Sequence, residues 1–216
     1  MLGRMRAAIF DMDGLLIDSE PLWRASEVEA FAKVGLTLTD EQCSETTGLR
    51  IDEVVALRHR EHPWTAPSVD VVVSQIVDRL IGLVQERGEA LPGVASALER
   101  CRTAGLRLAL ASSSPRRIID ATLARLELAD TFEVIASAEA DRYGKPHPAV
   151  FLRTADKLGV APTDCVVFED SLNGVIAAKA ARMMCVAVPE HHDPRFAIAD
   201  VVLSSLTEWR GLPGGG

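Results

Sequence analysis

Short apolar runs of the length of a β-strand recur along the chain between polar turns. They are AAIF (7–10), LRLALA (106–111), EVIAS (133–137), CVVF (165–168), CVAV (185–188) and DVVL (200–203). Helical patterns separate most of them; in residues 115–128, Ile119, Leu123 and Leu126 lie four and three residues apart. Strands that are apolar throughout and alternate with helices are typical of a parallel sheet covered on both faces. The pattern therefore predicts an α/β fold.

The segment from 19 to 88 breaks this alternation because it looks helical throughout. Residues 69–84 repeat apolar side chains at the i, i+3, i+4, i+7 spacing of a core-facing helix. Before Gly35, the pattern predicts a helix that buries Val28, Phe31 and Ala32 on one face. We expect a small helical domain at residues 19–88, inserted into a core domain made of residues 1–18 and 89–216.

Composition limits the partners of this protein. The chain of 216 residues has 23 Lys and Arg against 31 Asp and Glu, a formal net charge of −8. Nucleic acids and anionic membranes need a basic surface, so neither is expected as a partner, and an anionic substrate must meet local positive charge. The first apolar run is too short for a signal peptide, and no run approaches the ~18 residues of a membrane span. We expect a soluble cytoplasmic protein.

Polar side chains follow several of the predicted strands at their carboxyl ends, where parallel sheets bind ligands. They are Asp11, Asp13, Ser112, Ser113, Ser114, Lys145, Glu169 and Asp170. Each residue alone could be an ordinary loop or helix-capping residue. Together, however, the carboxylates cannot all stay ionised in one small cleft without a cation. Mg²⁺, which prefers oxygen ligands and often binds beside a substrate phosphate, is the expected cofactor.

Two acids at i and i+2 can do different chemical work. Beyond the first strand the chain turns, helped by Gly14, so Asp11 and Asp13 can both face the cleft. Asp11 would attack phosphorus and form an aspartyl phosphate. Asp13 would protonate the leaving oxygen and then take a proton from the attacking water. Ser112, the backbone N–H groups that follow it and Lys145 would bind the phosphoryl oxygens.

These motifs resemble those of a known family. DMDG (11–14), Ser112, KPHP (145–148) and FEDS (168–171) resemble, in order and spacing, the four motifs of the haloacid dehalogenase superfamily of phosphotransferases. The helical insertion is similar to the cap domain of the subfamily that contains β-phosphoglucomutase. The resemblance implies a Rossmann-like core with a helical cap, dependence on Mg²⁺, and a monomer.

The resemblance also implies roles for individual residues. Asp11 would be the nucleophile and Asp13 the general acid and base. Asp11, Asp170 and the backbone carbonyl of Asp13 would bind the metal, with Glu169 nearby or bridging through water. Longer stretches, among them AAIFDMDGLLIDSEPLW, resemble sugar-phosphate phosphatases of this subfamily. That likeness implies hydrolysis of hexose and hexitol phosphates, such as 2-deoxyglucose 6-phosphate.

Two alternative functions remain open at this point. In β-phosphoglucomutase, a histidine twelve residues after the nucleophile assists transfer to a second sugar hydroxyl; here that position is Trp23, which cannot relay a proton. A phosphomutase is therefore the alternative enzyme, and water is the expected acceptor. A phospho-acceptor signalling module is the alternative outside enzymology. Such modules have neither the helical insertion nor a second Asp two residues after the acceptor.

The insertion and the late loops supply further candidates. Trp23 either packs at the hinge or contacts substrate, and Arg50, in the predicted cap loop TTGLR, either binds sugar hydroxyls or is a solvated charge. Ser113 and Glu20 are candidate substrate contacts. Asn173 either reaches toward the phosphate-binding loop or caps the following helix.

Overall fold

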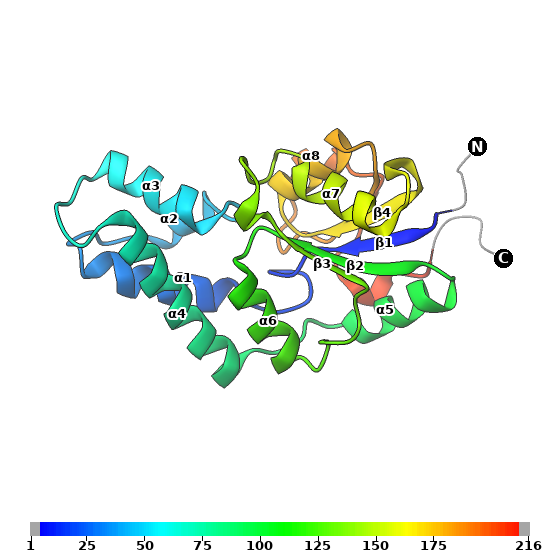
Figure 1. Ribbon diagram of the computed structural model, residues 1–216, viewed down its shortest axis with the longest axis horizontal. Helices are drawn as coiled ribbons and strands as arrows, with labels where there is room; N and C mark the ends of the chain where they lie inside the picture. The colour runs from blue at the N-terminus through cyan, green and yellow to red at the C-terminus, as the bar shows by residue number, and fades with distance from the viewer. Residues whose placement is uncertain (1–4, 212–216) are drawn as a thin grey trace.

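The computed structural model describes residues 5–211, so the ends of the predicted core domain, 1–4 and 212–216, lie outside it. Within the described range, parallel strands form one sheet in the order β3-β2-β1-β4-β5-β6 (Figure 1). Their bounds are Ala7–Phe10 (β1), Arg107–Ser112 (β2), Val134–Ser137 (β3), Cys165–Glu169 (β4), Met184–Ala187 (β5) and Val201–Val202 (β6). The predicted Rossmann-like α/β fold is confirmed.

Helices cover both faces of this sheet. They are α5 (Val94–Thr103), α6 (Arg116–Arg125), α7 (Ala149–Leu158) and α8 (Leu172–Ala180). Successive residues of β1 point to opposite faces: Phe10 joins the hydrophobic cluster under α5 and α6, and Ile9 joins the cluster under α7 and α8. Phe10 stacks on Phe168 of β4, with ring centroids 4.5 Å apart. The centre of the sheet is therefore buried against apolar side chains on both faces, and polar groups gather at the carboxyl ends of its strands.

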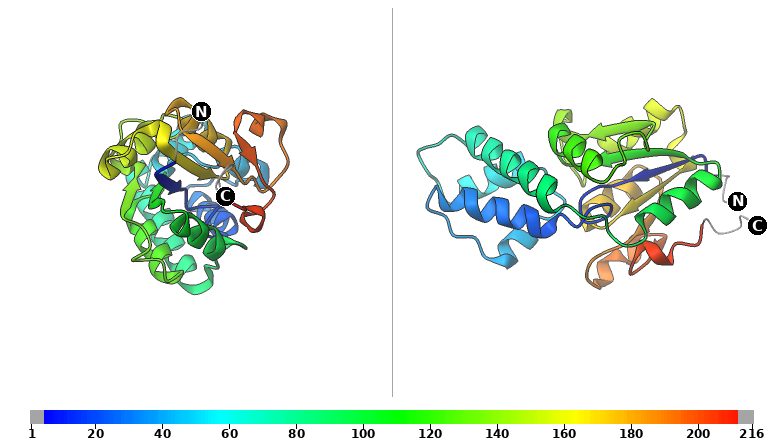
Figure 2. Two further views of the ribbon diagram at one scale, coloured as in Figure 1. Left: turned by 90° about the vertical axis from the view of Figure 1, so that its right-hand side faces the viewer. Right: turned by 90° about the horizontal axis from the view of Figure 1, so that it is seen from below.

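The remaining helices stand beside the sheet rather than on it, as Figure 2 shows. They are α1 (Glu20–Ala32), α2 (Asp40–Ser44), α3 (Ile51–Glu61) and α4 (Val69–Arg87), all between β1 and β2 in the chain. Short 3₁₀ turns lie at Ala138–Ala140, Pro162–Asp164, Pro194–Ile198 and Leu206–Glu208. The helical content of the insertion is confirmed; its division from the core at residues 18 and 88 stays a prediction.

Two of the three residues that were predicted to be buried on α1 are exposed, so that prediction was wrong for them. Phe31 is fully buried, but Val28 is 38% exposed and Ala32 is also exposed. The buried residues of this helix are Ser26, Glu27, Ala30 and Phe31. The helix packs Ala30 and Phe31 into the hydrophobic cluster that it shares with α4, and this rotation turns Val28 outward. No helix in the described part of the chain is long and apolar enough to cross a membrane.

Candidate active site

The loop after β1 brings Asp11 and Asp13 to the carboxyl edge of the sheet. The Asp11 backbone N–H donates to the Phe168 carbonyl (3.0 Å), which continues the strand pairing up to the first acid. Gly14 then turns the chain with a φ of +71°, and a side chain at this position would collide with the Asp170 carboxylate. A glycine is therefore required for the close approach of this loop to the end of β4.

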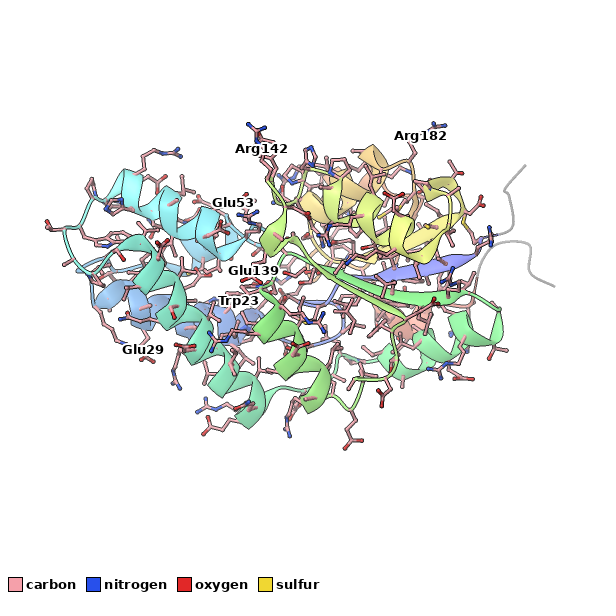
Figure 3. The ribbon with its side chains drawn as sticks, viewed as in Figure 1. Trp23, Glu29, Glu53, Glu139, Arg142 and Arg182 are labelled. Atoms are coloured by element: carbon pink, nitrogen blue, oxygen red, sulfur yellow. The ribbon has the colours of Figure 1, made fainter. Side chains whose placement is uncertain are left out.

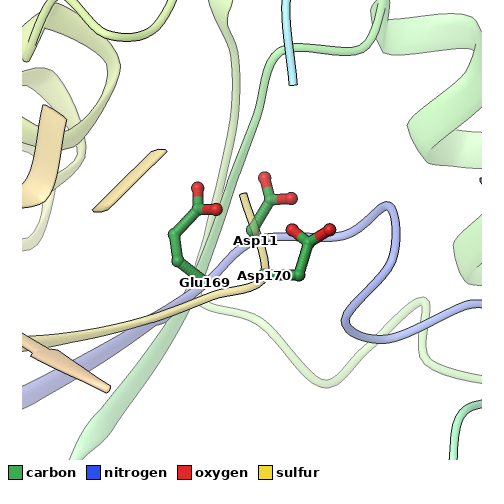
Figure 4. A group of neighbouring side chains, drawn as sticks. All are labelled: Asp11, Glu169 and Asp170. Atoms are coloured by element: carbon green, nitrogen blue, oxygen red, sulfur yellow. The ribbon is translucent and has the colours of Figure 1, made fainter. Parts of the chain in front are cut away.

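Acidic groups converge directly behind this turn. Carboxylate oxygens of Asp11, Glu169 and Asp170 lie within 4.8 Å of one another (Figure 4). Burial, and secondarily Glu169 and Asp13, raise the pKa of Asp11 to about 8 although Lys145 acts against them. Burial, followed by the charges of Glu169, Asp11 and Glu20, also raises the pKa of Asp170.

This group fits a hard divalent cation. The Asp170 Oδ1 atom is buried and has no hydrogen-bond partner among residues 5–211. The converging donors are all carboxylate oxygens, the type that Mg²⁺ and Ca²⁺ prefer. A cation beside Asp11 and Asp170 would favour their ionised forms, which burial alone opposes. The predicted metal residues Asp11, Glu169 and Asp170 are thus brought together, with Asp13 beside them in the same loop.

Lys145 provides local positive charge at the site, although the chain as a whole is negatively charged. Its Nζ donates to Asp11 Oδ1 (2.6 Å), Glu169 Oε1 (2.5 Å) and the Ala111 carbonyl (3.2 Å). Burial lowers the pKa of this ammonium, but Asp11 and Glu169 outweigh burial and raise it overall. Lys145 is 2% exposed and faces the cavity, so a buried cation stands next to Asp11.

Asp13 is surrounded by hydrogen-bond donors. Its Oδ1 accepts from Ser19 Oγ (2.7 Å) and from the Trp23 indole N–H (2.9 Å). Its Oδ2 accepts from Ser114 Oγ (2.6 Å), with Ser112 Oγ at 3.5 Å. The contact of Trp23 with Asp13 was not foreseen by either interpretation of this tryptophan. Nor did the sequence distinguish Ser114 from its neighbours, because all three serines follow the same strand.

The loop of residues 46–49 lies on the core. Ser113 Oγ donates to the Gly48 carbonyl (3.0 Å), and Asn173 Nδ2 donates to the Thr47 carbonyl (3.3 Å). Neither interpretation of Asn173 matches this contact: the bond goes to the loop of residues 46–49 and not to the phosphate-binding loop, and Ser171 caps α8 by accepting from the Gly174 N–H. Both side chains therefore hold the cap against the core.

Arg50 is not brought to the cavity. Its guanidinium donates to the carbonyls of Ala138 and Asp141 on the core and pairs with Asp52. Next to it, Glu53 accepts a hydrogen bond from the Gly144 N–H (3.2 Å), one residue before Lys145 (Figure 3). In this arrangement Arg50 is neither a sugar contact nor a solvated charge. The carbonyls of the β3–α7 loop face the cap, and they attract the guanidinium away from the cleft.

One cavity is lined by most of these core and cap residues. From the core it is lined by Asp11, Asp13, Ser112, Ser113, Ser114, Lys145, Asp170 and Ser171. From the cap it is lined by Glu20, Trp23, Arg24, Glu27, Ile51, Val54 and residues 43–44 and 46–49. Burial, Asp13 and Glu190 raise the pKa of Glu20 to about 7. Glu169 is fully buried behind Lys145 and does not line the cavity. Of the other candidate residues, Arg50 and Asn173 also lie outside its lining.

Glu27 is a cavity residue that the sequence did not single out. A glutamate in a helix is usually on the solvated face, yet Glu27 is only 8% exposed. A signal was present, because Glu20, Trp23, Arg24 and Glu27 follow the i, i+3, i+4, i+7 spacing of one helix face.

Comparisons with known proteins agree with this geometry. Residues 5–182 match the family model described as haloacid dehalogenase-like hydrolase. Hexitol phosphatase B of Escherichia coli (strain K12) is 50% identical over 206 residues, which cover 94% of this chain and 93% of that protein. The crystal structure of CbbY from Rhodobacter sphaeroides in complex with phosphate superposes with a TM-score of 0.88 at 30% identity, over 96% of this chain and 97% of that one. A β-phosphoglucomutase from Clostridium difficile shares the fold, with a TM-score of 0.85 at 23% identity, over 95% of this chain and 93% of that one. The chain therefore belongs to the haloacid dehalogenase-like hydrolases.

Proposed function

We propose that this protein is a Mg²⁺-dependent phosphatase that hydrolyses hexose and hexitol phosphates through an aspartyl phosphate on Asp11. One observation carries the proposal: Asp11 and Asp13 line the same cavity but have different neighbours. Asp11 lies beside Lys145 and belongs to the acidic cluster, whereas Asp13 accepts hydrogen bonds from a hydroxyl and an indole N–H. The 50% identical relative is named for its action on hexitol phosphates, which supports the same substrate class here.

The chemistry takes place in two transfers. A carboxylate oxygen of Asp11 attacks phosphorus; the Asp11 O–P bond forms, the bond from phosphorus to the sugar oxygen breaks, and Asp13 gives its proton to that oxygen. Water then gives a proton to Asp13 and attacks phosphorus, which releases phosphate and restores Asp11. The hydrogen bonds from Ser19, Trp23 and Ser114 hold the Asp13 carboxyl in position for both transfers.

Other residues bind the charges of the reaction. Lys145 contacts Asp11, and Ser112 Oγ lies 3.5 Å from Asp13 Oδ2. Both residues line the cavity and would hold the phosphoryl oxygens, where negative charge gathers in the transition state. Asp11, Asp170 and the backbone carbonyl of Asp13 would hold Mg²⁺, with Glu169 keeping Lys145 in place. When bound, the cation supplies positive charge that offsets the carboxylates and the substrate phosphate.

Trp23 favours hydrolysis over phosphomutase activity. Its indole N–H is engaged by Asp13 and has no second exchangeable proton with which to relay a transfer to a sugar hydroxyl. Water is then the acceptor of the phosphoryl group. That the enzyme acts in the cytoplasm as a monomer stays a prediction from the sequence.

The test is phosphate release from a panel of sugar phosphates, with Mg²⁺ and with EDTA. The panel includes 2-deoxyglucose 6-phosphate, hexitol phosphates and β-glucose 1-phosphate. We expect release from several hexose and hexitol phosphates that needs Mg²⁺. Conversion of β-glucose 1-phosphate to glucose 6-phosphate without release of phosphate would instead establish a phosphomutase. Release that continues undiminished in EDTA would remove the metal from the proposal.

A further inference from the structure

One face of α1 is polar where a packed helix is normally apolar. Glu20, Trp23, Arg24 and Glu27 lie at i, i+3, i+4 and i+7, and all four line the cavity. The same helix packs Ala30 and Phe31 into the hydrophobic core. The polar face is therefore turned toward the cavity, although burying it there is unfavourable without partners.

Glu27 is the most buried member of this face, at 8% exposure. Its Oε2 atom is buried and has no hydrogen-bond partner in the described part of the chain. Burial and the nearby Glu20 raise the pKa of Glu27 to about 7, and only Arg58 acts against them. The guanidinium of Arg58 makes its hydrogen bonds to Glu61 and to the Gln42 carbonyl. Glu27 thus lines the cavity with a carboxylate of which one oxygen is buried and has no protein partner among the described residues.

The position of Glu27 along the helix tells which part of a ligand it meets. Trp23 contacts Asp13, the proposed proton donor to the leaving oxygen. Glu27 follows Trp23 by four residues, which places it ~6 Å farther along the helix axis. It therefore lies on the cap side of the cavity, beyond the catalytic acids. A leaving group must extend away from phosphorus by several carbon atoms to reach it.

We propose that Glu27 accepts a hydrogen bond from a distal hydroxyl of the leaving group and so selects hexose and hexitol phosphates over short phosphomonoesters. This inference rests on the proposed function and deepens it. A hexitol carries a hydroxyl on every carbon along its length, so it offers a donor at the distance of Glu27. Glycerol 3-phosphate ends near the catalytic acids and leaves the Glu27 oxygen unpaired. Discrimination follows because a buried polar group without its partner opposes binding of the shorter ligand.

The test compares two substrates in variants of one residue. kcat/KM is measured with Mg²⁺ for a hexitol 6-phosphate and for glycerol 3-phosphate, in the wild type, Glu27→Gln and Glu27→Leu. We expect the ratio of the two values to fall about tenfold or more in Glu27→Leu, and less in Glu27→Gln, whose amide still offers a hydrogen bond. Glu29→Gln is the matched control, because Glu29 lies on the outer side of the same helix, paired with Lys33 and Arg79 (Figure 3). Its ratio should equal that of the wild type.

A purely structural role of Glu27 gives a different result. It would lower kcat/KM for both substrates equally, or lower Tm, whereas we expect the Tm of Glu27→Leu to be unchanged or higher because an unpaired buried carboxyl is removed. An unchanged ratio in both Glu27 variants, with a wild type that prefers the hexitol phosphate, would overturn this inference and leave the phosphatase standing. A wild type that releases phosphate from neither substrate would overturn both. Glu27→Gln, nearly isosteric, decides the matter if Glu27→Leu does not fold.

Discussion

Asp11 and Asp13 are two residues apart but have opposite surroundings. Asp11 is buried against Lys145 and other carboxylates. Asp13 is partly exposed and accepts hydrogen bonds from hydroxyl groups and an indole N–H. Paired acids in unlike environments are a common arrangement for a division of labour between a nucleophile and a proton carrier. At the residue scale, the hypothesis of two roles is therefore supported by two different sets of neighbours.

Asp11→Asn should lower kcat about a thousandfold or more while the fold is retained. The amide is nearly isosteric with the carboxylate, but it is a poor nucleophile. Phosphate release measures the loss, and far-ultraviolet circular dichroism checks the fold. Asp120→Asn, at an exposed pair with Arg116, is the control and should keep full activity. Retained turnover in Asp11→Asn would remove the covalent mechanism.

Trp23→Phe should lower kcat about fivefold to tenfold. The substitution keeps an aromatic ring but removes one of the hydrogen bonds that orient Asp13, a loss of about 1 kcal/mol. Steady-state kinetics with a hexitol phosphate measures it. Trp64→Phe removes a comparable indole hydrogen bond, to the Pro67 carbonyl in the loop between α3 and α4, and should leave kcat unchanged. Equal kcat values in the two variants would show that the contact with Asp13 has no part in catalysis.

At the scale of elements, the sequence predicted the sheet better than it predicted the faces of the cap helices. The strands of the sheet centre are apolar on both sides, so a continuous run such as 165–168 identifies them without knowledge of neighbours. The helix α1 has two partners, the hydrophobic core and a polar cavity. Hydrophobicity alone therefore selected Val28, which is exposed, over Glu27, which is buried. A helix face that lines a ligand site can be polar although it is buried, so the search for apolar residues does not find it.

The contacts between cap and core could also not be predicted from the sequence. Arg50 crosses from the N-terminus of α3 to carbonyls that lie far along the chain, at residues 138 and 141. Backbone acceptors leave no mark in the sequence because every residue carries one. The Arg50 contacts and the Glu53–Gly144 hydrogen bond together tie the cap to the loop that carries Lys145. The cap therefore contacts the segment that leads to Lys145 at three points.

Arg50→Lys should lower kcat/KM about tenfold. A lysine keeps the charge, but its single nitrogen cannot donate to both carbonyls and at the same time pair with Asp52 through two further N–H groups, so the closed cap is less stable and water is less well excluded. Kinetics with a hexose phosphate measures the change. Arg117→Lys is the control, since Arg117 pairs with Asp78 of the cap through side chains that are 65% and 56% exposed, and such pairs contribute little. An equal loss in both variants would show that any ion pair between cap and core acts in the same way.

At the scale of the whole molecule, the strand ends made most of the site predictable. In a parallel sheet every carboxyl end reaches the same edge, so Asp11, Ser112 and Asp170 had to lie close together whatever the loops did. Lys145 follows from the same topology, because its loop leaves the end of β3. The cap residues have no such geometric rule. Their positions depend on how the inserted helices rest on the core, which a single sequence does not express.

The stability of the whole protein should fall as pH rises from about 5 to about 8 in EDTA. Burial raises the folded-state pKa of Asp11 to about 8 and of Glu20 and Glu27 to about 7. In this range the folded state holds more protons than the unfolded state, so the free energy of unfolding decreases with increasing pH. Exposed carboxyls with lowered pKa values, such as Asp193 and Glu208, act in the opposite direction only below about pH 4.5.

Thermal unfolding at several pH values measures this dependence, and we expect Tm to fall by about 5 °C or more across the range. Mg²⁺ should reduce the fall, because a cation that binds the ionised carboxylates of Asp11 and Asp170 favours the folded state. Glu27→Leu should reduce it in EDTA as well, since one of the buried titrating groups is gone. A Tm that rises with pH in EDTA would contradict the assignment of these acids as buried groups with raised pKa values. A slope that Mg²⁺ leaves unchanged would mean that the acidic cluster does not hold the cation, since binding there must favour the ionised, folded form over the unfolded chain.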